Sequence, residues 1–103
     1  MRVRVSGLQI KIIWRMHRHG KYGRSHTSTE NATKGFPSHL GREVREGLHD
    51  LVKRGMIVAK PTTYGLQVSL NEHRIEAIWA ICDFFKARSG DVRDWEVYEI
   101  EAD

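Results

Sequence analysis

Residues 38–71 join the pattern of an amphipathic helix directly to the pattern of a β-hairpin. Within "SHLGREVREGLHDLVKRG", apolar side chains recur every three or four residues on one side, as in a helix with one buried face. The members of this stripe are Leu40, Val44, Leu48, Leu51 and Val52. Ser38 is expected to cap the helix, and Gly55 to end it in a left-handed conformation. Gly41 and Gly47 lie toward the apolar side and predict close approach of another helix.

The hairpin pattern follows at once. "MIVAK" is an apolar run with β-branched residues, "PTTYG" has the proline and glycine of a turn, and "LQVSL" alternates apolar and polar residues. This alternation predicts Leu66, Val68 and Leu70 inward, with Gln67 and Ser69 outward. Two such runs joined by five residues that include a glycine predict a pair of antiparallel strands.

Three other segments also have helical patterns. Residues 6–20 begin with Ser6 as a candidate cap and end at Gly20. A short helix over about residues 28–34 begins at "TSTE", which has the form of a capping box. After the hairpin, Asn71 is expected to cap a helix that extends to about residue 88. Its expected core stripe is Ile75, Ile78, Trp79, Cys82 and Phe85, widened by Ile81 and Phe84.

The first and last of these helices have wide apolar arcs. In residues 6–20 the stripe of Leu8, Ile12 and Met16 is extended around the helix by Ile10 and Trp14. Two explanations are open. The helices pack across the two-fold axis of a homodimer, or they cover each other within one chain. We expect the homodimer.

Charge is distributed unevenly along the 103 residues. Residues 1–60 hold 13 lysines and arginines against 4 acidic residues, whereas residues 61–103 hold 4 against 9. Such segregation predicts a cationic face for a polyanion and an acidic surface elsewhere. We divide the chain into a domain over 1–71, a C-terminal helix over 72–89 that is the candidate dimerisation element, and an acidic segment over 90–103. That segment is expected to be either a short strand laid on the domain or a mobile tail.

The order of helix, short helix, tight turn, longer helix and hairpin resembles the winged helix-turn-helix family, which includes many small bacterial and archaeal transcription regulators. The resemblance covers residues 7–71, and its most specific part is "LHDLVKRGMI", Leu48 to Ile57. In that family such a run ends the recognition helix and begins the wing. The resemblance implies an α+β, mostly α fold with a three-helix core, a β-hairpin wing and, here, an extra C-terminal helix. The glycine, serine and threonine content of residues 20–38 departs from the family pattern and predicts a short or distorted second helix.

The resemblance implies sequence-specific binding of double-stranded DNA and a role in transcription regulation. The side of the longer helix opposite its core stripe would then enter the major groove. Arg42 is the candidate base contact, because arginine paired with guanine is the commonest specific contact, and His39 lies near the helix end that meets bases. Glu46 either accepts a hydrogen bond from cytosine or neutralises Arg42 one turn away. The candidate DNA-binding residues on this side are Ser38, His39, Arg42, Arg45, Glu46, His49 and Lys53, of which Ser38, Arg45 and Lys53 are expected at phosphates.

The hairpin is expected to contact the adjacent minor groove or backbone through Lys60, Thr62, Thr63 and Tyr64. Further candidates for phosphate contacts are the arm "MRVR" and a basic strip on the first helix, formed by Lys11, Arg15 and Arg18. The alternative function is that of a winged-helix adaptor, which binds protein or structured RNA in the transcription or translation machinery.

Other classes of protein are disfavoured. No window reaches the roughly 18 consecutive apolar residues of a membrane helix, and Lys11 and Arg15 interrupt the apolar N-terminal part, so we expect no signal peptide and a cytoplasmic location. Cys82 is the single cysteine and cannot form an intrachain disulfide. The histidines lack the spacing of a structural zinc site, and there is no phosphate-binding glycine loop or nucleophile motif. We therefore expect no enzyme activity, metal or cofactor.

Overall fold

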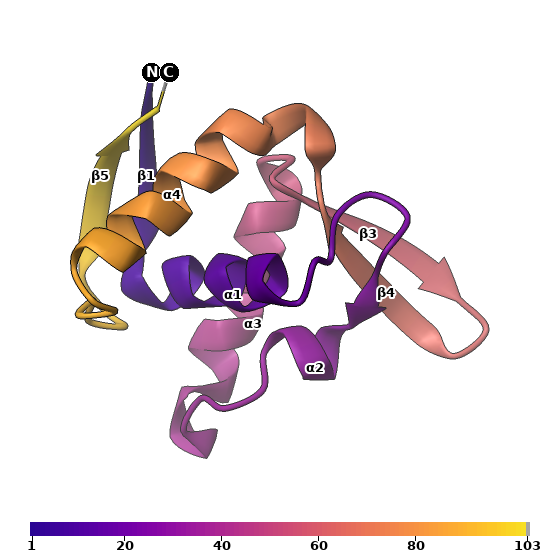
Figure 1. Cartoon of the computed structure of the whole chain (residues 1–103). Helices are drawn as coiled ribbons and strands as arrows, with labels where there is room; N and C mark the ends of the chain where they lie inside the picture. The colour runs from indigo at the N-terminus through magenta and orange to yellow at the C-terminus, as the bar shows by residue number, and fades with distance from the viewer. Residues whose placement is uncertain (103) are drawn as a thin grey trace.

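The two ends of the chain lie side by side in a small antiparallel sheet (Figure 1). In the computed structural model, which describes residues 1–102, β1 (Arg2–Ser6) pairs with β5 (Val97–Glu101), and Val3 lies opposite Ile100. Inward residues alternate with exposed ones along both strands, as expected for a sheet with one buried face. The C-terminal segment is thus a strand and not a free tail, and the N-terminal arm, which the sequence did not predict as a strand, is its partner.

Helix boundaries follow capping residues, with three corrections. The helices are α1 (Gly7–Arg18), α2 (Thr29–Ala32), α3 (Gly41–Lys53) and α4 (Ile75–Ala87), with 3₁₀ turns η1 (Ser38–Leu40) and η2 (Glu72–Arg74). Ser6 caps α1 as expected, and Gly20 and Gly55 have positive φ after α1 and α3. Asn71 caps η2, the turn that leads into α4, and not α4 itself. Ser38 is not a cap, because it lies inside η1 after Pro37. The cap of α2 is Ser28 and not Thr27, and α2 is only one turn long.

The predicted hairpin is present and belongs to a second, three-stranded sheet. β3 (Ile57–Thr62) and β4 (Gly65–Leu70) pair across a two-residue turn, and β2 (Thr27–Ser28) pairs with the other edge of β4. Val68 and Leu70 are buried as predicted. Leu66 is instead 44% exposed, because the hairpin end extends beyond the body of the protein. Ser69, expected outward, is buried because β4 is the central strand.

The core is centred on α1, which packs against both α3 and α4. Ile10, Ile12 and Ile13 are fully buried, so the wide arc of α1 is covered within one chain. The stripe of α4 is rotated from the predicted one. Its buried members are Ala77, Ile78, Ile81 and Cys82, whereas Trp79 is 54% exposed. The unpredicted β1–β5 sheet explains the rotation, since Phe84 of α4 packs edge-on against Tyr98 of β5 at 5.3 Å between ring centroids.

One of the two glycines in α3 allows a close approach of helices. A Cβ atom at Gly47 would lie 3.1 Å from Leu8 Cδ2, so α1 and α3 meet there. At Gly41 a Cβ would lie 3.3 Å from Arg45 Nη1 of the same helix and near no atom of another helix within residues 1–102, so the prediction of close helix packing was wrong for Gly41. Gly41 lies at the start of α3, beyond the contact with α1.

The described residues form an α+β fold with four α-helices and two small antiparallel sheets. The Cα radius of gyration is 12.7 Å, and a single compact domain of this length is expected near 13 Å. Residues 1–102 include no helix with the length and apolar character that a membrane crossing requires.

Candidate nucleic-acid interface

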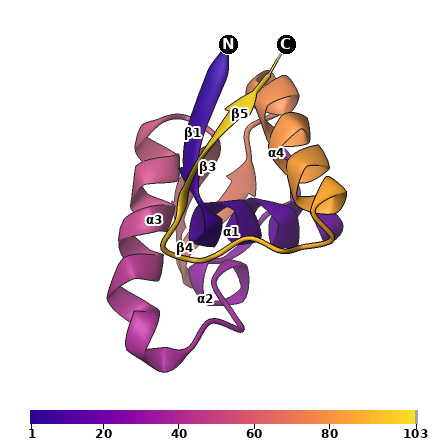
Figure 2. The same ribbon diagram turned by 90° about the vertical axis from the view of Figure 1, so that its left-hand side faces the viewer.

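The seven candidate residues of the longer helix and of η1 share one exposed surface, which we call the α3 face. Figure 2 shows α3 along one side of the molecule. Val44, Leu48 and Leu51 are buried on its inner side, where Gly47 meets α1, so the opposite side points away from the core. All members of the α3 face are exposed: Ser38, His39, Arg42, Arg45, Glu46, His49 and Lys53.

Electrostatically, the α3 face is cationic with one internal ion pair. Arg42 Nε lies 3.1 Å from Glu46 Oε1, and both side chains are largely exposed. Of the two interpretations of Glu46, the structure shows the one in which it neutralises Arg42. Within residues 1–102, Arg45 and Lys53 take part in no ion pair. An exposed i,i+4 pair stabilises by only about 0.3–0.5 kcal/mol, so a ligand can displace Glu46 from Arg42 at small cost.

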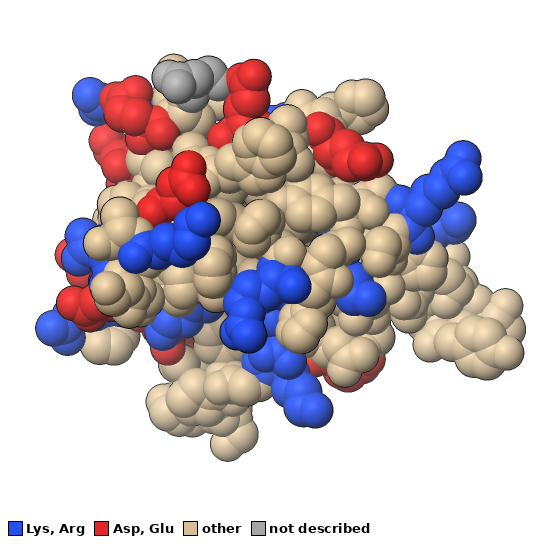
Figure 3. Space-filling view, in the orientation of Figure 1, with Lys and Arg blue, Asp and Glu red and all other residues tan. Residues whose placement is uncertain are grey.

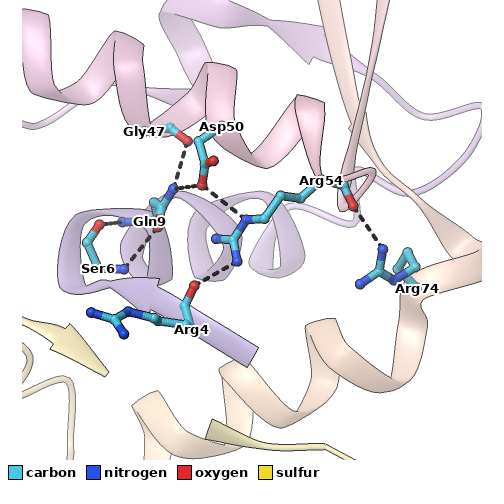
Figure 4. Close-up of polar contacts among 7 residues, drawn as sticks. All are labelled: Arg4, Ser6, Gln9, Gly47, Asp50, Arg54 and Arg74. Atoms are coloured by element: carbon cyan, nitrogen blue, oxygen red, sulfur yellow. Dashed lines mark hydrogen bonds and ion pairs between the residues drawn. The ribbon is translucent and has the colours of Figure 1, made fainter. Parts of the chain in front are cut away.

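A buried glutamine fixes the position of α3 relative to α1 (Figure 4). Gln9 is 7% exposed and completes a capping box, in which its Oε1 accepts from the Ser6 amide at 2.9 Å and its own amide donates to Ser6 Oγ. Its Nε2 donates to Gly47 O at 3.1 Å and to Asp50 Oδ2 at 2.8 Å, both on α3. One side chain therefore links the start of α1 to the middle of α3.

Arg54 extends this network to the strand β1. Its Nε lies 3.0 Å from Asp50 Oδ2, and its Nη1 donates to Arg4 O at 2.7 Å. The carbonyl oxygen of Arg54 accepts from Arg74 Nη1 at 2.8 Å (Figure 4). The arginine next to Lys53 in sequence thus holds the C-terminal end of α3 in place. Sequence reasoning missed Gln9 and Arg54. The one available signal was the Ser6–Gln9 spacing of a capping box.

The four candidate residues of the hairpin differ in whether their side chains are available to a ligand. Thr63 and Tyr64 form the turn, and Tyr64 is 94% exposed. Lys60 is exposed on β3. Thr62 is committed to the turn itself, because its Oγ1 donates to Gly65 O at 2.7 Å and accepts from the Tyr64 amide. Lys60, Thr63 and Tyr64 are therefore free to meet a ligand, whereas Thr62 supports the turn.

The N-terminal arm is not a free cationic segment. Arg2 Nε lies 2.8 Å from Glu101 Oε1, and Arg4 lies 3.8 Å from Glu99 across the β1–β5 sheet. The hydrogen bond and charge of Glu101 raise the pKa of Arg2. A phosphate contact by this arm would have to replace these pairs.

Viewed from the side of α1, acidic and basic side chains are distributed unevenly over the surface. Figure 3 shows acidic side chains gathered toward the top of the view, over α4 and the chain ends, and Lys and Arg side chains below the centre, over α1 and α2. Both signs are mixed at the left of the view, so the segregation along the chain is reproduced only in part on this side.

Two ionisable groups, Cys82 of α4 and Tyr22 of the segment after α1, have raised pKa values. Burial raises the pKa of the Cys82 thiol to about 12, and burial also raises the pKa of Tyr22 to about 12. Both groups therefore remain protonated at neutral pH. The described residues contain no group of three His, Cys, Asp or Glu side chains placed to hold a metal ion.

Comparisons were made with protein-family models, with curated proteins and with solved structures. None of them gives a match to this chain. Any functional assignment therefore depends on the surface geometry described above.

Proposed function

We propose that this chain is a winged helix-turn-helix protein that binds double-stranded DNA, with α3 in the major groove and the β3–β4 hairpin on the adjacent backbone or minor groove. The observation that carries the proposal is the α3 face. Its side chains are exposed together on the outer side of a helix that is itself fixed to the core by Gln9 and Gly47. The major groove of B-DNA admits one α-helix, and exposed arginines on that helix can contact base edges.

The order of the elements supports the same proposal. Eight residues, which include η1, separate α2 from α3, so the connection is longer than the tight turn expected from the sequence. The hairpin begins four residues after α3 ends. In Figure 1 the N-terminal end of α3 and the hairpin turn both lie toward the lower part of the molecule, with α2 between them. A duplex along this side would meet the start of α3, with Ser38 and His39, and also the hairpin turn.

Each member of the α3 face has a role in the proposal. Arg42 leaves Glu46 and pairs with a base, most favourably guanine, while Glu46 becomes free to accept from cytosine. Arg45 and Lys53 contact phosphates, which position the helix without selecting a sequence. The biological role that follows is transcription regulation by a cytoplasmic protein without enzymatic activity.

A titration of duplexes with the purified protein tests the proposal. Labelled genomic and random-sequence duplexes are followed by fluorescence anisotropy at several salt concentrations. Lys53→Ala should weaken binding to all duplexes alike and lower the slope of log affinity against log salt by about 1. Arg42→Ala should reduce the preference among duplexes, by about 1–3 kcal/mol for a lost bidentate pair. Lys86→Ala is the matched control, because Lys86 is an exposed lysine on α4. Equal effects of the Lys53 and Lys86 variants would contradict the proposal.

The adaptor function is the second candidate, and the hairpin end favours it. Tyr64 and Leu66 are 94% and 44% exposed, and Pro61 beside them is exposed, so this end is more apolar than phosphate contacts need. Aromatic residues of this kind are enriched in protein interfaces. The adaptor proposal predicts that Tyr64→Ala abolishes capture of a partner protein while duplex binding stays weak and independent of sequence. A structured RNA added as competitor tests the RNA form of this proposal.

The homodimer is a separate prediction. Of the apolar arcs that suggested it, the arc of α1 is covered within one chain, whereas Trp79 on the arc of α4 is 54% exposed. A mass measurement in solution, with and without a duplex, decides the oligomeric state.

A further inference from the structure

A second cationic surface lies over α1 and α2 and borders the α3 face where Pro37 precedes Ser38. Two adjacent hollows occupy it, with volumes of about 220 and 270 Å³, and both are lined in part by Arg15. The first also has Met16, His19, Lys21, Thr27, Asn31 and Ala32 on its walls. The walls of the second hollow also include Lys11, Trp14, Arg18, Lys34, Gly35, Phe36, Pro37 and Asp94. We call this surface the α1–α2 face. It includes the basic side chains below the centre of Figure 3.

The α1–α2 face has the electrostatics of a site for phosphates. The described residues that line the first hollow include no acid. The acid of the second, Asp94, is neutralised by Lys11, whose Nζ lies 2.7 Å from Asp94 Oδ1. Arg15 Nε donates to Asn31 O at 2.8 Å, and this bond fixes the guanidinium between the two hollows. The two terminal amino groups of the guanidinium can then donate to a ligand. Arg18 and Lys34 are exposed at the rim.

Aromatic rings stand among these cations. Trp14 and Phe36 both line the second hollow and are half-buried, so part of each ring is open to solvent. Trp14 packs against Phe85, at 5.1 Å between ring centroids, and against His17, at 5.7 Å between ring centroids. Rigid aromatic faces beside cations are the components of surfaces that bind unpaired bases and their phosphates.

We propose that the α1–α2 face binds single-stranded nucleic acid, with phosphates at Arg15, Arg18 and Lys34 and bases on Trp14 and Phe36. An intact duplex offers no free base face to these rings. It is also a rigid convex body, which would rest on the rims of the hollows rather than enter them. A flexible strand can follow two hollows joined at Arg15. The proposal does not depend on the function of the α3 face.

The test uses fluorescein-labelled oligothymidylate of about 12 nucleotides and the corresponding oligouridylate, followed by anisotropy at low salt. The double variant Arg18→Glu/Lys34→Glu should weaken strand binding about tenfold or more, because it reverses two phosphate-contacting charges. Lys86→Glu, which reverses an exposed lysine on α4, should change it less than about twofold. Phe36→Leu keeps an apolar side chain but removes the ring, and should weaken binding by at least about fivefold. Thermal melting confirms that each variant is folded.

A further variant separates this proposal from duplex binding by α3. Arg42→Ala should leave the affinity for the strands unchanged, whereas the double variant should leave the preference among duplexes unchanged. The proposal is overturned if neither strand binds, if Lys86→Glu and the double variant have equal effects, or if Phe36→Leu binds as the wild type does. It is also overturned if the double variant weakens duplex binding and not strand binding. A difference between the two oligonucleotides identifies DNA or RNA as the preferred strand.

Discussion

Replacement of Gln9 by leucine should remove the hydrogen bonds that hold α3 against α1 and leave the hydrophobic core intact. Leucine has a similar volume and fits a site that is 7% exposed, but it makes none of the side-chain hydrogen bonds. The Ser6 amide loses its acceptor at 2.9 Å, and Gly47 O loses its donor at 3.1 Å. Each bond of this kind contributes about 1 kcal/mol, and more where a buried group is left unpaired. Asp50 loses a third bond, but it is half-exposed and keeps Arg54 as a partner, so its share is smaller. The expected loss is about 2–3 kcal/mol in the free energy of unfolding.

Urea denaturation followed by tryptophan fluorescence and by circular dichroism measures this loss. Ser6→Ala is the matched control, because it removes only the cap and should cost about 1 kcal/mol. Gln9→Leu should also weaken duplex binding, since α3 then loses its two bonds to α1, whereas Ser6→Ala should leave duplex binding nearly unchanged. A loss below about 0.5 kcal/mol for Gln9→Leu would refute the reasoning, because it would mean that core packing and the Arg54 contacts position α3 without Gln9.

Two other predictions concern stability. Gly7→Ala should destabilise the protein by more than about 3 kcal/mol, because the new Cβ would lie 1.9 Å from the backbone oxygen of Arg93. Gly41→Ala should instead stabilise it by up to about 1 kcal/mol, because alanine favours the helix more than glycine does. Thermal melting of the two variants checks the sign of each change. Burial raises the pKa values of Cys82 from 9.0 and Tyr22 from 10.0 to about 12 each, so the unfolded chain releases these protons first and stability should fall as pH rises from 9 to 12. Cys82→Ala should lose less stability over this interval, and an equal loss in both proteins would contradict the assignment to the thiol.

The hairpin and the principal helices could be predicted from local pattern, because each has its own signal. The stripe of Val44, Leu48 and Leu51 fixes which side of α3 is buried, and therefore which side is exposed. Gly20 and Gly55 mark the ends of α1 and α3, since both have positive φ. The α3 face was accessible to sequence reasoning for this reason: it is the complement of a clear apolar stripe.

Features that depend on distant contacts were not predictable in the same way. β1 and β5 are at opposite ends of the chain, and nothing in "RVRVS" alone indicates that its partner is "VYEIE". Because this sheet was not predicted, Trp79 was wrongly placed in the core stripe of α4. The sheet covers the side of α4 that carries Phe84. Gln9 is a polar residue on a helix with a wide apolar arc, and its bonds to α3 appear only when α1 and α3 are placed together.

The central claim is that a duplex binds to the α3 face and to the hairpin turn. Isotope-labelled protein is titrated with a short duplex, and the amide chemical shifts of the whole chain are followed by NMR. The account predicts that the largest changes lie between Ser38 and Lys53 and around Thr63 and Tyr64, and that α4 is unaffected. Changes confined to α4 and β5, or no changes at all at low salt, would contradict it.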